Sequence, residues 1–301
     1  MKRNSDSRAV APLERSAGLS GAGTAEIGAL RPNEFEQIRT LARRASGLDL
    51  QPGKEELVSA RLRRLVRAGG HQSFRDYYDA VRADATGKAL ASMIDALTTN
   101  HTSFLRESGH FEFLRRHVLS KWPRNRPLDI WSAGCATGEE VWTIAFLVND
   151  ALPGQFLRIT ATDISMHALA FAERAIYPAA RCEGIPRKWL LRYLTAIGDD
   201  SYRVVQSVRE QAAFTRLNLI EPLPWRRLFP AIFCRNVMIY FDRSTQERVV
   251  QALADRLEPG GYLFVGHSEG LTRVKHSLEY VRPAVYRKPD SDARMRKCPQ
   301  P

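Results

Sequence analysis

The sequence predicts an α/β protein in which a mostly parallel β-sheet follows a small all-α domain. From about residue 127 onward, short apolar runs bounded by Gly, Asp or Asn alternate with amphipathic segments, which is the pattern of βαβ units. Between residues 31 and 97, apolar residues instead recur at three- and four-residue steps, as in helices. With 301 residues, 44% of them apolar, the chain is long enough for one large domain and one small domain.

The N-terminal part divides into a tail and a helical domain. Residues 1–27 are rich in Ser, Ala, Gly and Arg without periodicity, and we expect them to form a disordered tail. The all-α domain should span residues 28–97. Its first helix begins near Arg31 and is interrupted at Gly47. Three further helices are expected at 55–68, 74–81 and 88–97.

The helix expected at 55–68 has two different faces. Its apolar residues share one face, and the other carries four arginines: Arg61, Arg63, Arg64 and Arg67. A basic stripe of this kind is most often a solvated surface. It can also dock an acidic partner helix, and the sequence alone leaves both interpretations open.

The α/β domain is expected at residues 123–288. A linker helix with a flap, at 98–122, should precede it, and a second disordered tail, at 289–301, should follow. The expected strands are the apolar runs at 128–131, 157–162, 231–234, 262–265 and 284–286.

The alternation of strands and helices breaks between residues 187 and 217. A short helix there leads to two β-like runs, near 202–205 and 212–217. We therefore predict a small β-hairpin insert over residues 187–217.

A turn of small residues follows the first expected strand in the segment LDIWSAGCATGEE. Small residues such as Gly134 and Gly138 let the backbone approach a ligand and adopt tight-turn dihedral angles. The turn lacks the GxGxxG spacing of dinucleotide sites and the Lys-Ser/Thr of a phosphate loop. Because Glu139 and Glu140 then open a helix, a cationic or neutral adenosine-type ligand fits better than a phosphate.

Asp163 ends the second expected strand. A carboxylate at this place can accept hydrogen bonds from both ribose hydroxyls, or it can cap the helix that follows. The glycine turn 29 residues earlier favours the nucleoside interpretation.

Two further segments place polar residues near the same edge of the sheet. In IFCRNVMIYF, Arg235 and Asn236 stand at the carboxyl end of an apolar strand, and Tyr240 lies in the following loop. An ion pair and a cap at a strand edge are the alternative, but the position of this pair at the carboxyl end of a central strand favours ligand binding. In LTTNHTSFLRE, threonines and Asn100 crowd beside Phe104 and Arg106, which suits a flap over a cofactor better than a plain linker.

Composition excludes several classes of protein. The net charge of +12 is spread along the chain and does not by itself indicate a nucleic-acid binder. No apolar run approaches the ~20 residues that span a bilayer, and the N-terminus lacks the apolar segment of a secretory signal. We therefore expect a cytoplasmic protein without membrane insertion. The four cysteines are far apart, so neither a disulfide framework nor a metal site is expected.

Taken together, six segments resemble one family, the chemoreceptor glutamate O-methyltransferases (CheR). They occur in the order of the family and span roughly residues 30 to 288: TTNHTSFLRE, SAGCATGEE, ATDIS, LNLIEPLP, FCRNVMIYF and GYLFVGHSE. The resemblance implies a Rossmann-like methyltransferase domain that uses S-adenosyl-L-methionine (SAM) and releases S-adenosyl-L-homocysteine (SAH). It also implies methyl transfer to glutamate side chains on the cytoplasmic helices of bacterial methyl-accepting chemotaxis receptors, which forms methyl esters for adaptation.

The resemblance also assigns individual residues. Its cofactor contacts fall on Asn100, Thr102, Arg106, Glu140, Asp163, Asn218, Leu219, Arg235 and Asn236, beside Gly134 of the glycine turn. Its substrate-facing aromatic residue falls on Tyr240, and its receptor-docking helix on Arg61–Arg67.

We expect a monomer in which Arg106 and Tyr240 hold the acceptor carboxylate, while Asp163 and Glu140 anchor the adenosine end. Arg106 could equally bind the carboxylate of the cofactor itself. The hairpin near 197–201 is short beside those of members that grip a receptor's C-terminal peptide, so such binding is not expected. Trp142-Thr143 and Pro230 depart from common family residues without removing a ligand.

Three other functions fit the sequence less well. The main alternative is a SAM- or SAH-binding regulator of a chemosensory-type pathway that transfers no methyl group. A nucleic-acid methyltransferase would need an Asp/Asn-Pro-Pro-aromatic motif or stacking aromatics, and neither occurs in the sequence. A dinucleotide oxidoreductase is disfavoured because GxGxxG is missing.

Overall fold

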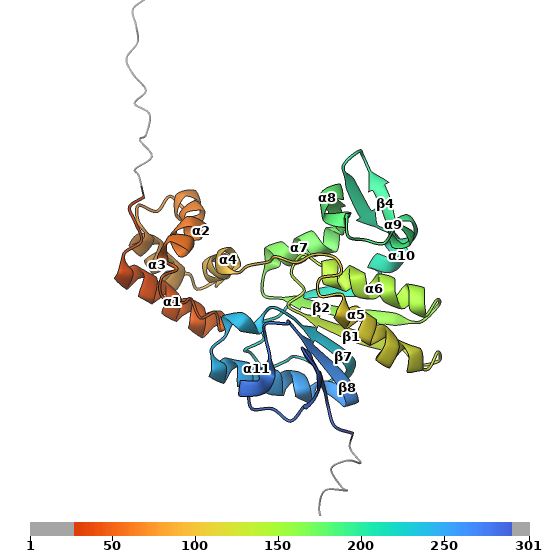
Figure 1. The fold of residues 1–301 in the computed structure, drawn as a ribbon. Helices are drawn as coiled ribbons and strands as arrows, with labels where there is room; N and C mark the ends of the chain where they lie inside the picture. The colour runs from red at the N-terminus through yellow and green to blue at the C-terminus, as the bar shows by residue number, and fades with distance from the viewer. Residues whose placement is uncertain (1–26, 291–301) are drawn as a thin grey trace, which may run out of the picture.

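The computed structural model describes residues 27–290, which form two adjoining domains (Figure 1). The expected tails at 1–27 and 289–301 therefore lie almost wholly outside the described residues. Helices α1 to α4 make up the N-terminal domain, and α4 leads directly to the second domain. The second domain contains the main sheet and a small insert beside α7.

The N-terminal domain consists of α1 (Pro32–Ser46), α2 (Glu55–Ala68), α3 (Phe74–Ala83) and α4 (Lys88–Leu97). All four begin at or within one residue of the expected position, because amphipathic spacing and local start and stop signals define them. Gly47 ends α1 with a left-handed backbone (φ 76°). Buried residues from every helix form one core, among them Ile38, Leu62, Phe74 and Met93.

The main sheet has seven strands in the order β6-β2-β1-β7-β8-β10-β9. Five neighbouring strands, β6 to β8 in this order, pair in parallel, and β10 pairs antiparallel to β8 and β9. The predicted α/β class with a mostly parallel sheet is confirmed. The strands are β1 (Leu128–Ala133), β2 (Leu157–Asp163), β6 (Ala212–Arg216), β7 (Phe229–Cys234), β8 (Leu257–Val265), β9 (Glu279–Arg282) and β10 (Val285–Arg287).

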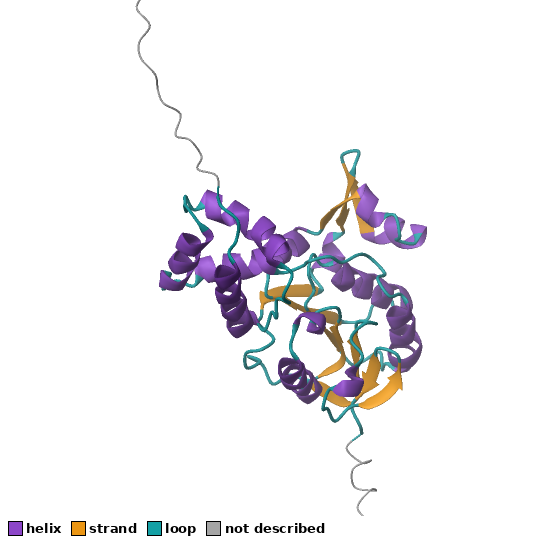
Figure 2. Ribbon diagram, turned by 60° about the vertical axis from the view of Figure 1, so that its left-hand side comes forward, coloured by secondary structure: helices purple, strands orange, loops and turns teal. Residues whose placement is uncertain are grey.

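Helices cover both faces of this sheet (Figure 2). Successive residues of a strand point to opposite faces, so a buried central strand must be apolar on both. In β7, Ala231 and Phe233 enter one core with residues of α6 (Glu139–Ala151), whereas Ile232 and Cys234 enter the other with residues of α11 (Arg243–Asp255). The result is a three-layer α/β/α arrangement.

The connections from β1 and β7 leave the sheet in opposite directions. The chain passes from β1 through α6 to β2 on one side, whereas β7 lies on the other side of β1 and leads to β8. In open α/β sheets, the crevice outside the carboxyl ends of two such strands is where ligands bind. The glycine turn after β1 and the Arg235-Asn236 pair after β7 both flank this crevice.

The insert differs from the prediction. It is a three-stranded antiparallel sheet, β3-β5-β4, of Ile176–Pro178, Ser201–Val204 and Leu194–Ile197. Short helices accompany it: α8 (Ala179–Cys182), α9 (Arg187–Tyr193) and α10 (Gln206–Arg209). The run at 212–217, which we placed in the insert, is instead β6, paired with β2 at the edge of the main sheet. The residues of β6 are exposed or half-buried, which is also typical of the strands of a small hairpin.

The connecting segment between the domains contains Gly109–Phe113 (α5), a π-helical turn, Leu114–Val118 (η1), and a 3-10 turn, Leu119–Lys121 (η2). Further short elements are α7 (Met166–Arg174) and the turns Met238–Tyr240 (η3) and Leu271–Arg273 (η4).

Backbone pairing joins the two domains. Leu48, after α1, forms a bridge with Phe241, and the N–H of Asp49 donates to the carbonyl of Tyr240 at 2.8 Å. Arg43 of α1 also forms an ion pair with Asp242, the N-cap residue of α11. The loop that carries Tyr240 is therefore held by the N-terminal domain.

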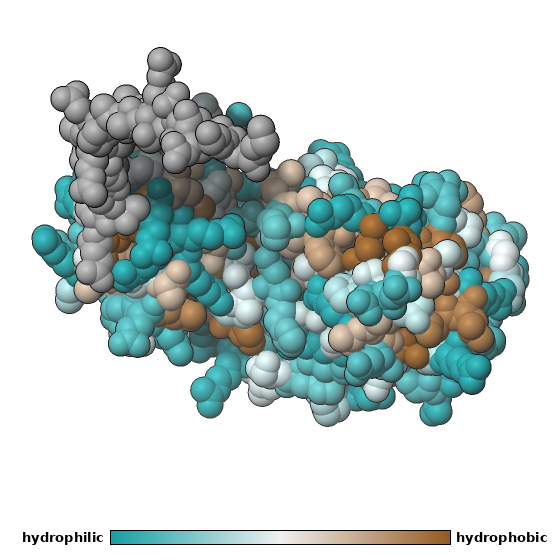
Figure 3. Space-filling model, turned by 90° about the horizontal axis from the view of Figure 1, so that it is seen from above, coloured by the Kyte–Doolittle hydropathy of each residue, from teal (hydrophilic) through white to brown (hydrophobic). Residues whose placement is uncertain are grey.

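Hydrophobic surface is divided into separate areas among hydrophilic ones in the view from above (Figure 3). Individual apolar residues such as Leu191 and Phe156 are strongly exposed. Among residues 27–290, no helix has both the length and the apolar composition needed to cross a bilayer.

We predict that Asp242→Ala lowers the free energy of unfolding by about 1 kcal/mol, because α11 loses its N-cap. The N–H of Thr245, the Ser244 hydroxyl and Arg43 hold the pKa of Asp242 well below its usual value, against a smaller opposing effect of burial. Chemical denaturation followed by circular dichroism measures the change.

Asp242→Asn is the control, because asparagine caps as well but carries no charge. Since the folded pKa is lowered, the ionised carboxylate stabilises the wild type fully above pH ~4, the unfolded value. The advantage of the wild type over Asp242→Asn should therefore shrink as the pH falls below ~4. An advantage that grows at acidic pH would contradict this origin.

Candidate active site

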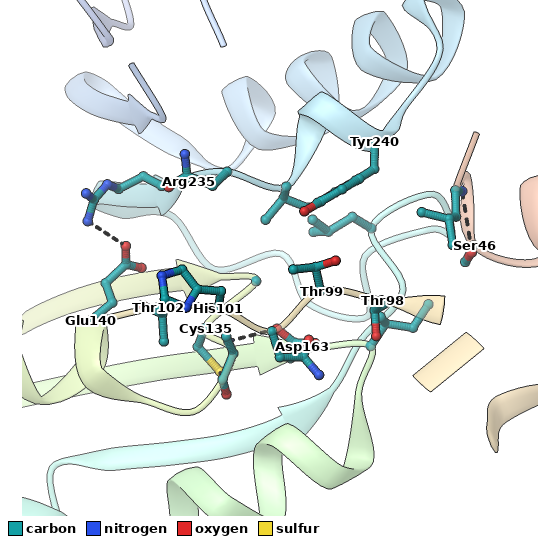
Figure 4. A pocket seen from close by; sticks show the side chains of 18 of the residues that line it. Ser46, Thr98, Thr99, His101, Thr102, Cys135, Glu140, Asp163, Arg235 and Tyr240 are labelled. Carbon is teal, nitrogen blue, oxygen red and sulfur yellow. Dashed lines mark hydrogen bonds and ion pairs between the residues drawn. The ribbon is translucent and has the colours of Figure 1, made fainter. Parts of the chain in front are cut away.

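A cavity of about 920 Å³, including its open mouth, lies at the crevice between the β1 and β7 loops (Figure 4). Eleven residues that we singled out from the sequence line it: Asn100, Thr102, Arg106, Gly134, Glu140, Asp163, Asn218, Leu219, Arg235, Asn236 and Tyr240. Segments up to 140 residues apart in the sequence thus meet at one place.

The glycine turn forms one wall of the cavity. Gly134 has φ 88°, and a Cβ built on it would lie 2.3 Å from Cγ2 of Val237. Only glycine therefore allows the β1 and β7 loops to approach so closely. Cys135 beside it is buried, and burial raises the pKa of its thiol well above the usual value, so the thiol stays protonated.

Asp163 supports the turn from the end of β2. Its Oδ2 accepts the N–H of Ala136 at 2.8 Å, and its Oδ1 accepts the N–H of Ser165 at 2.9 Å. Burial raises the pKa of Asp163, although these two hydrogen bonds oppose the shift. Capping of α7 falls to Ser165, whose hydroxyl accepts the N–H of Ala168. Each oxygen of Asp163 keeps a lone pair for a ligand.

Arg235 is the charged centre of the site. Its side chain is almost fully buried, and its guanidinium forms ion pairs with Glu140 at 3.0 Å and Glu107 at 3.1 Å. It also donates to the backbone carbonyl of Arg106. Burial alone would raise the pKa of Glu107, but Arg235 and the N–H of His267 bring it below the usual value. Arg235 thus joins β7, α6 and the flap.

Glu269 is a residue that our sequence analysis did not single out, although it lies in the quoted segment GYLFVGHSE. Its buried carboxylate accepts three backbone N–H groups, from Gly266 and Asn236 at 2.6 Å each and from Ile239 at 3.1 Å. Asn236 has φ 60°, an uncommon value for a residue other than glycine. Glu269 fixes this strained loop, and a lone Glu after a strand gives no sequence signal of such a role.

The flap, residues 97–107, contributes several residues to the lining of the cavity and is held by hydrogen bonds at several points. Arg61 of α2 donates to the carbonyl of Leu97 and to the Thr99 hydroxyl at 2.8 Å. Further along, Asn100 donates to the Ser165 hydroxyl at 3.1 Å. These bonds come from both domains, so both position the flap.

Arg106 and Tyr240 face the cavity from opposite segments. The ring of Tyr240 points from η3 into the cavity (Figure 4). Arg106 donates one hydrogen bond, to the carbonyl of His101 at 2.9 Å, and has no carboxylate partner among residues 27–290. Most of its guanidinium donors therefore remain available to an anionic ligand.

The four arginines of α2 differ in their surroundings. Arg61 holds the flap, and Arg63 donates to the carbonyl of Ile27 and to Ser59. Arg64 and Arg67 are exposed, and their side chains form no ion pair or hydrogen bond within the described part of the chain. Receptor docking by this helix remains a prediction, with Arg64 and Arg67 as its freest members.

Comparisons with known proteins give the class of this fold and site. Residues 100–286 match the family model described as "CheR methyltransferase, SAM binding domain". Together with the three-layer sheet and the cavity at its crevice, this match defines a SAM-dependent methyltransferase.

The chain belongs to the CheR family, as residues 33–98 also match "CheR methyltransferase, all-alpha domain". It is 35% identical over 267 residues to the chemotaxis protein methyltransferase of Borreliella burgdorferi, covering 85% of this chain and 94% of the relative. Chemotaxis protein methyltransferase 2 of Pseudomonas aeruginosa is 37% identical, with 84% and 92% covered. The chemotaxis protein methyltransferase of Salmonella typhimurium is 35% identical, with 86% and 91% covered.

The donor groups of the cavity fit SAM. Asp163 offers free lone pairs that suit ribose hydroxyls, and Gly134 lets a ligand approach the backbone. Glu140 and Arg235 offer opposite charges, which suit the ammonium and carboxylate groups of an amino-acid end.

We predict that Gly134→Ala weakens SAH binding at least about tenfold, equivalent to ~1.4 kcal/mol. The new methyl group meets Val237, and alanine is strained at φ 88°. Isothermal titration calorimetry measures the affinity.

Gly184→Ala is the matched control, because a Cβ at Gly184 would meet nothing within 4 Å. Its affinity for SAH should equal that of the wild type. Equal affinities for Gly134→Ala and Gly184→Ala would show that the close approach of the two loops does not shape the cofactor site.

Proposed function

We propose that this enzyme transfers the methyl group of SAM to glutamate side-chain carboxylates of methyl-accepting chemotaxis receptors. The curated relatives are named chemotaxis protein methyltransferases, and methyl transfer in chemotaxis is therefore the activity of the family. The observation that carries the glutamate acceptor is the position of Arg106 and Tyr240. They line the same cavity as Asp163 and Gly134, and Arg106 lacks a carboxylate partner among residues 27–290.

The cofactor residues divide into two groups in this proposal. Asp163 binds the ribose hydroxyls. Glu140, which we first assigned to the adenosine end, is paired with Arg235 to one side of Asp163 (Figure 4), so we assign this pair to the charged amino-acid end. Asn100, Thr102, Asn218, Leu219 and Asn236 complete the lining.

The chain's own residues need only orient the acceptor and exclude water. SAM supplies an electrophilic methyl group on a sulfonium. A glutamate carboxylate, with a reference pKa of ~4.3, is already ionised at neutral pH, so no residue has to remove a proton. His101, which also lines the cavity, therefore has no required role as a base. Correct orientation of reacting groups can supply roughly 7–11 kcal/mol.

Arg106 and Tyr240 are the residues we assign to orientation of the acceptor. A guanidinium can hold one oxygen of the carboxylate and leave the other directed at the methyl group. The backbone of Tyr240 is fixed by Asp49, so the N-terminal domain contributes to this orientation.

Docking of the receptor is assigned to the exposed face of α2. Arg64 lies one turn from Arg61, which bonds to the cavity-lining Thr99, so this face continues toward the cavity mouth. An acidic receptor helix suits these guanidinium groups through charge complementarity. The enzyme then works as a cytoplasmic monomer on receptor helices, without nucleic acid.

The proposed reaction is tested with radiolabelled SAM and receptor-containing membranes. We expect a label on the receptor that mild base removes, because esters hydrolyse where amides do not. Arg106→Ala and Tyr240→Phe should lower the rate at least about tenfold, since both orient the acceptor. Receptor whose methylation-site glutamates are replaced by alanine is the control.

A base-stable label would contradict the glutamate acceptor. SAH binding without any label would favour the regulatory alternative, in which the protein binds SAM or SAH without turnover. Wild-type turnover by Arg106→Ala would remove this residue from the mechanism.

We predict that Arg64→Glu combined with Arg67→Glu raises the KM for receptor at least about fivefold, because the acidic partner is now repelled. SAH affinity, measured by calorimetry, should stay unchanged, since both side chains are exposed and unpaired in the described structure.

Lys121→Glu combined with Arg226→Glu is the matched control, because both side chains are exposed on the second domain and, like those of Arg64 and Arg67, form no ion pair or hydrogen bond within residues 27–290. Their charge reversal should leave the KM for receptor unchanged. An equal effect of both double variants would indicate a general charge effect rather than docking through α2.

A further inference from the structure

We propose that Glu107, His110 and His267 form a binding site for a divalent transition-metal ion of the zinc class. One ligand atom from each side chain lies within 4.8 Å of those of the other two. Glu107 is the last residue of the flap, His110 lies on α5, and His267 follows β8. None of these residues belongs to the proposed cofactor or acceptor contacts.

His110 is the strongest sign that this cluster is built for a ligand. Its imidazole is fully buried, and neither ring nitrogen has a hydrogen-bond partner among residues 27–290. A buried polar group without a partner costs about 1–3 kcal/mol. A metal–nitrogen bond would satisfy this group where the surrounding side chains do not.

The spacing of the ligand atoms suits tetrahedral coordination. Nδ1 of His110 lies 3.5 Å from Oε2 of Glu107. For metal–ligand bonds of ~2.0–2.1 Å, neighbouring ligands of a tetrahedron lie about 3.4 Å apart. The rings of His110 and His267 are 5.1 Å apart between centroids. His267 is exposed, so a rotamer change can bring its nitrogen closer and also provides the entry path.

The nearby charge of Arg235 opposes a cation, but the other contacts of this residue compensate. Oε2 of Glu107, the oxygen nearest His110, is also the oxygen that Arg235 binds at 3.1 Å, so a metal would share or replace this ion pair. Arg235 would then keep its ion pair with Glu140 and its hydrogen bond to the carbonyl of Arg106. Burial, with a smaller effect of Arg235, lowers the pKa of His110 to about 3, so its imidazole is neutral and has a free lone pair. The carboxylate of Glu107 and the imidazole of His110 are therefore in the protonation states that metal binding requires.

The donor set selects the class of metal. Two imidazoles and one carboxylate suit zinc and its neighbours in the first transition series, whereas magnesium and calcium prefer oxygen ligands. Three protein ligands leave a fourth position for water. A metal ion here would link the base of the flap to the loop after β8, beside Arg235.

The test measures zinc binding by untagged full-length protein in competition with a chromophoric chelator. Cys298 is replaced by Ser in every sample, because a thiolate also binds zinc. We expect one equivalent of Zn²⁺ per chain, and affinity at least about tenfold weaker in His267→Ala and in Glu107→Gln. His110 is retained, because its loss would open a cavity in the core.

His117→Ala is the matched control, since His117 is exposed on η1 and outside the cluster. It should bind zinc as the wild type does. Zinc should also raise the melting temperature of the wild type and of His117→Ala, but not of His267→Ala. Absence of a stoichiometric site, or equal affinity in all variants, would overturn the proposal. Neither readout depends on methyl transfer, so the result is independent of the proposed function.

Discussion

The buried guanidinium of Arg235 is the contact on which the rest of the site depends. It lies at the end of β7 and binds Glu140 at the start of α6 and Glu107 at the end of the flap. Loss of one partner from a buried ion pair leaves an uncompensated charge, which typically costs 3–5 kcal/mol. Because each partner belongs to a different segment, this cost couples the sheet, the helix and the flap. Placement of the flap over the cavity is thus a consequence of charge pairing, not only of chain connectivity.

The N-terminal domain participates in the same arrangement. Asp49 holds the backbone of Tyr240, and Arg61 holds the flap at Leu97 and Thr99. Each contact reaches a segment that lines the cavity. The all-α domain is therefore part of the site's support, and a movement of this domain on docking would be transmitted to both sides of the cavity mouth.

Local features of the site could be predicted from sequence. The helix at 55–68 has its observed bounds because its apolar spacing and the following glycines are local signals. The positions of Gly134 and Asp163 at strand ends could also be predicted, because each directly follows or ends a short apolar run. Roles that depend on distant partners could not be predicted. The edge strand β6 was assigned to the insert, because pairing with β2 is decided by a register that no local pattern encodes.

Residue type alone also could not predict which side chains form hydrogen bonds with backbone groups. Glu269 accepts hydrogen bonds from three backbone N–H groups. In the sequence it is only an acidic residue after a strand. Arg61 belonged to a stripe that looked uniform, yet it bonds to the flap whereas Arg64 is free in the described structure. Glu107 and His267 lie 160 positions apart, so no ligand spacing could reveal that they meet.

Strain in the backbone is concentrated where these contacts converge. Six residues other than glycine have positive φ among residues 27–290. Four of them lie in the flap or in the loops after β1 and β7: Leu105, Glu107, Ala136 and Asn236. Such conformations cost of order 1–3 kcal/mol each and persist only when the surrounding structure holds them. The carboxylate of Asp163 lies at the packed end of β2 and accepts the N–H of Ala136. This hydrogen bond holds Ala136 in its strained conformation. Contacts of this kind therefore keep the strained loops in the ligand-binding shape before any ligand arrives, which lowers the entropy lost on binding.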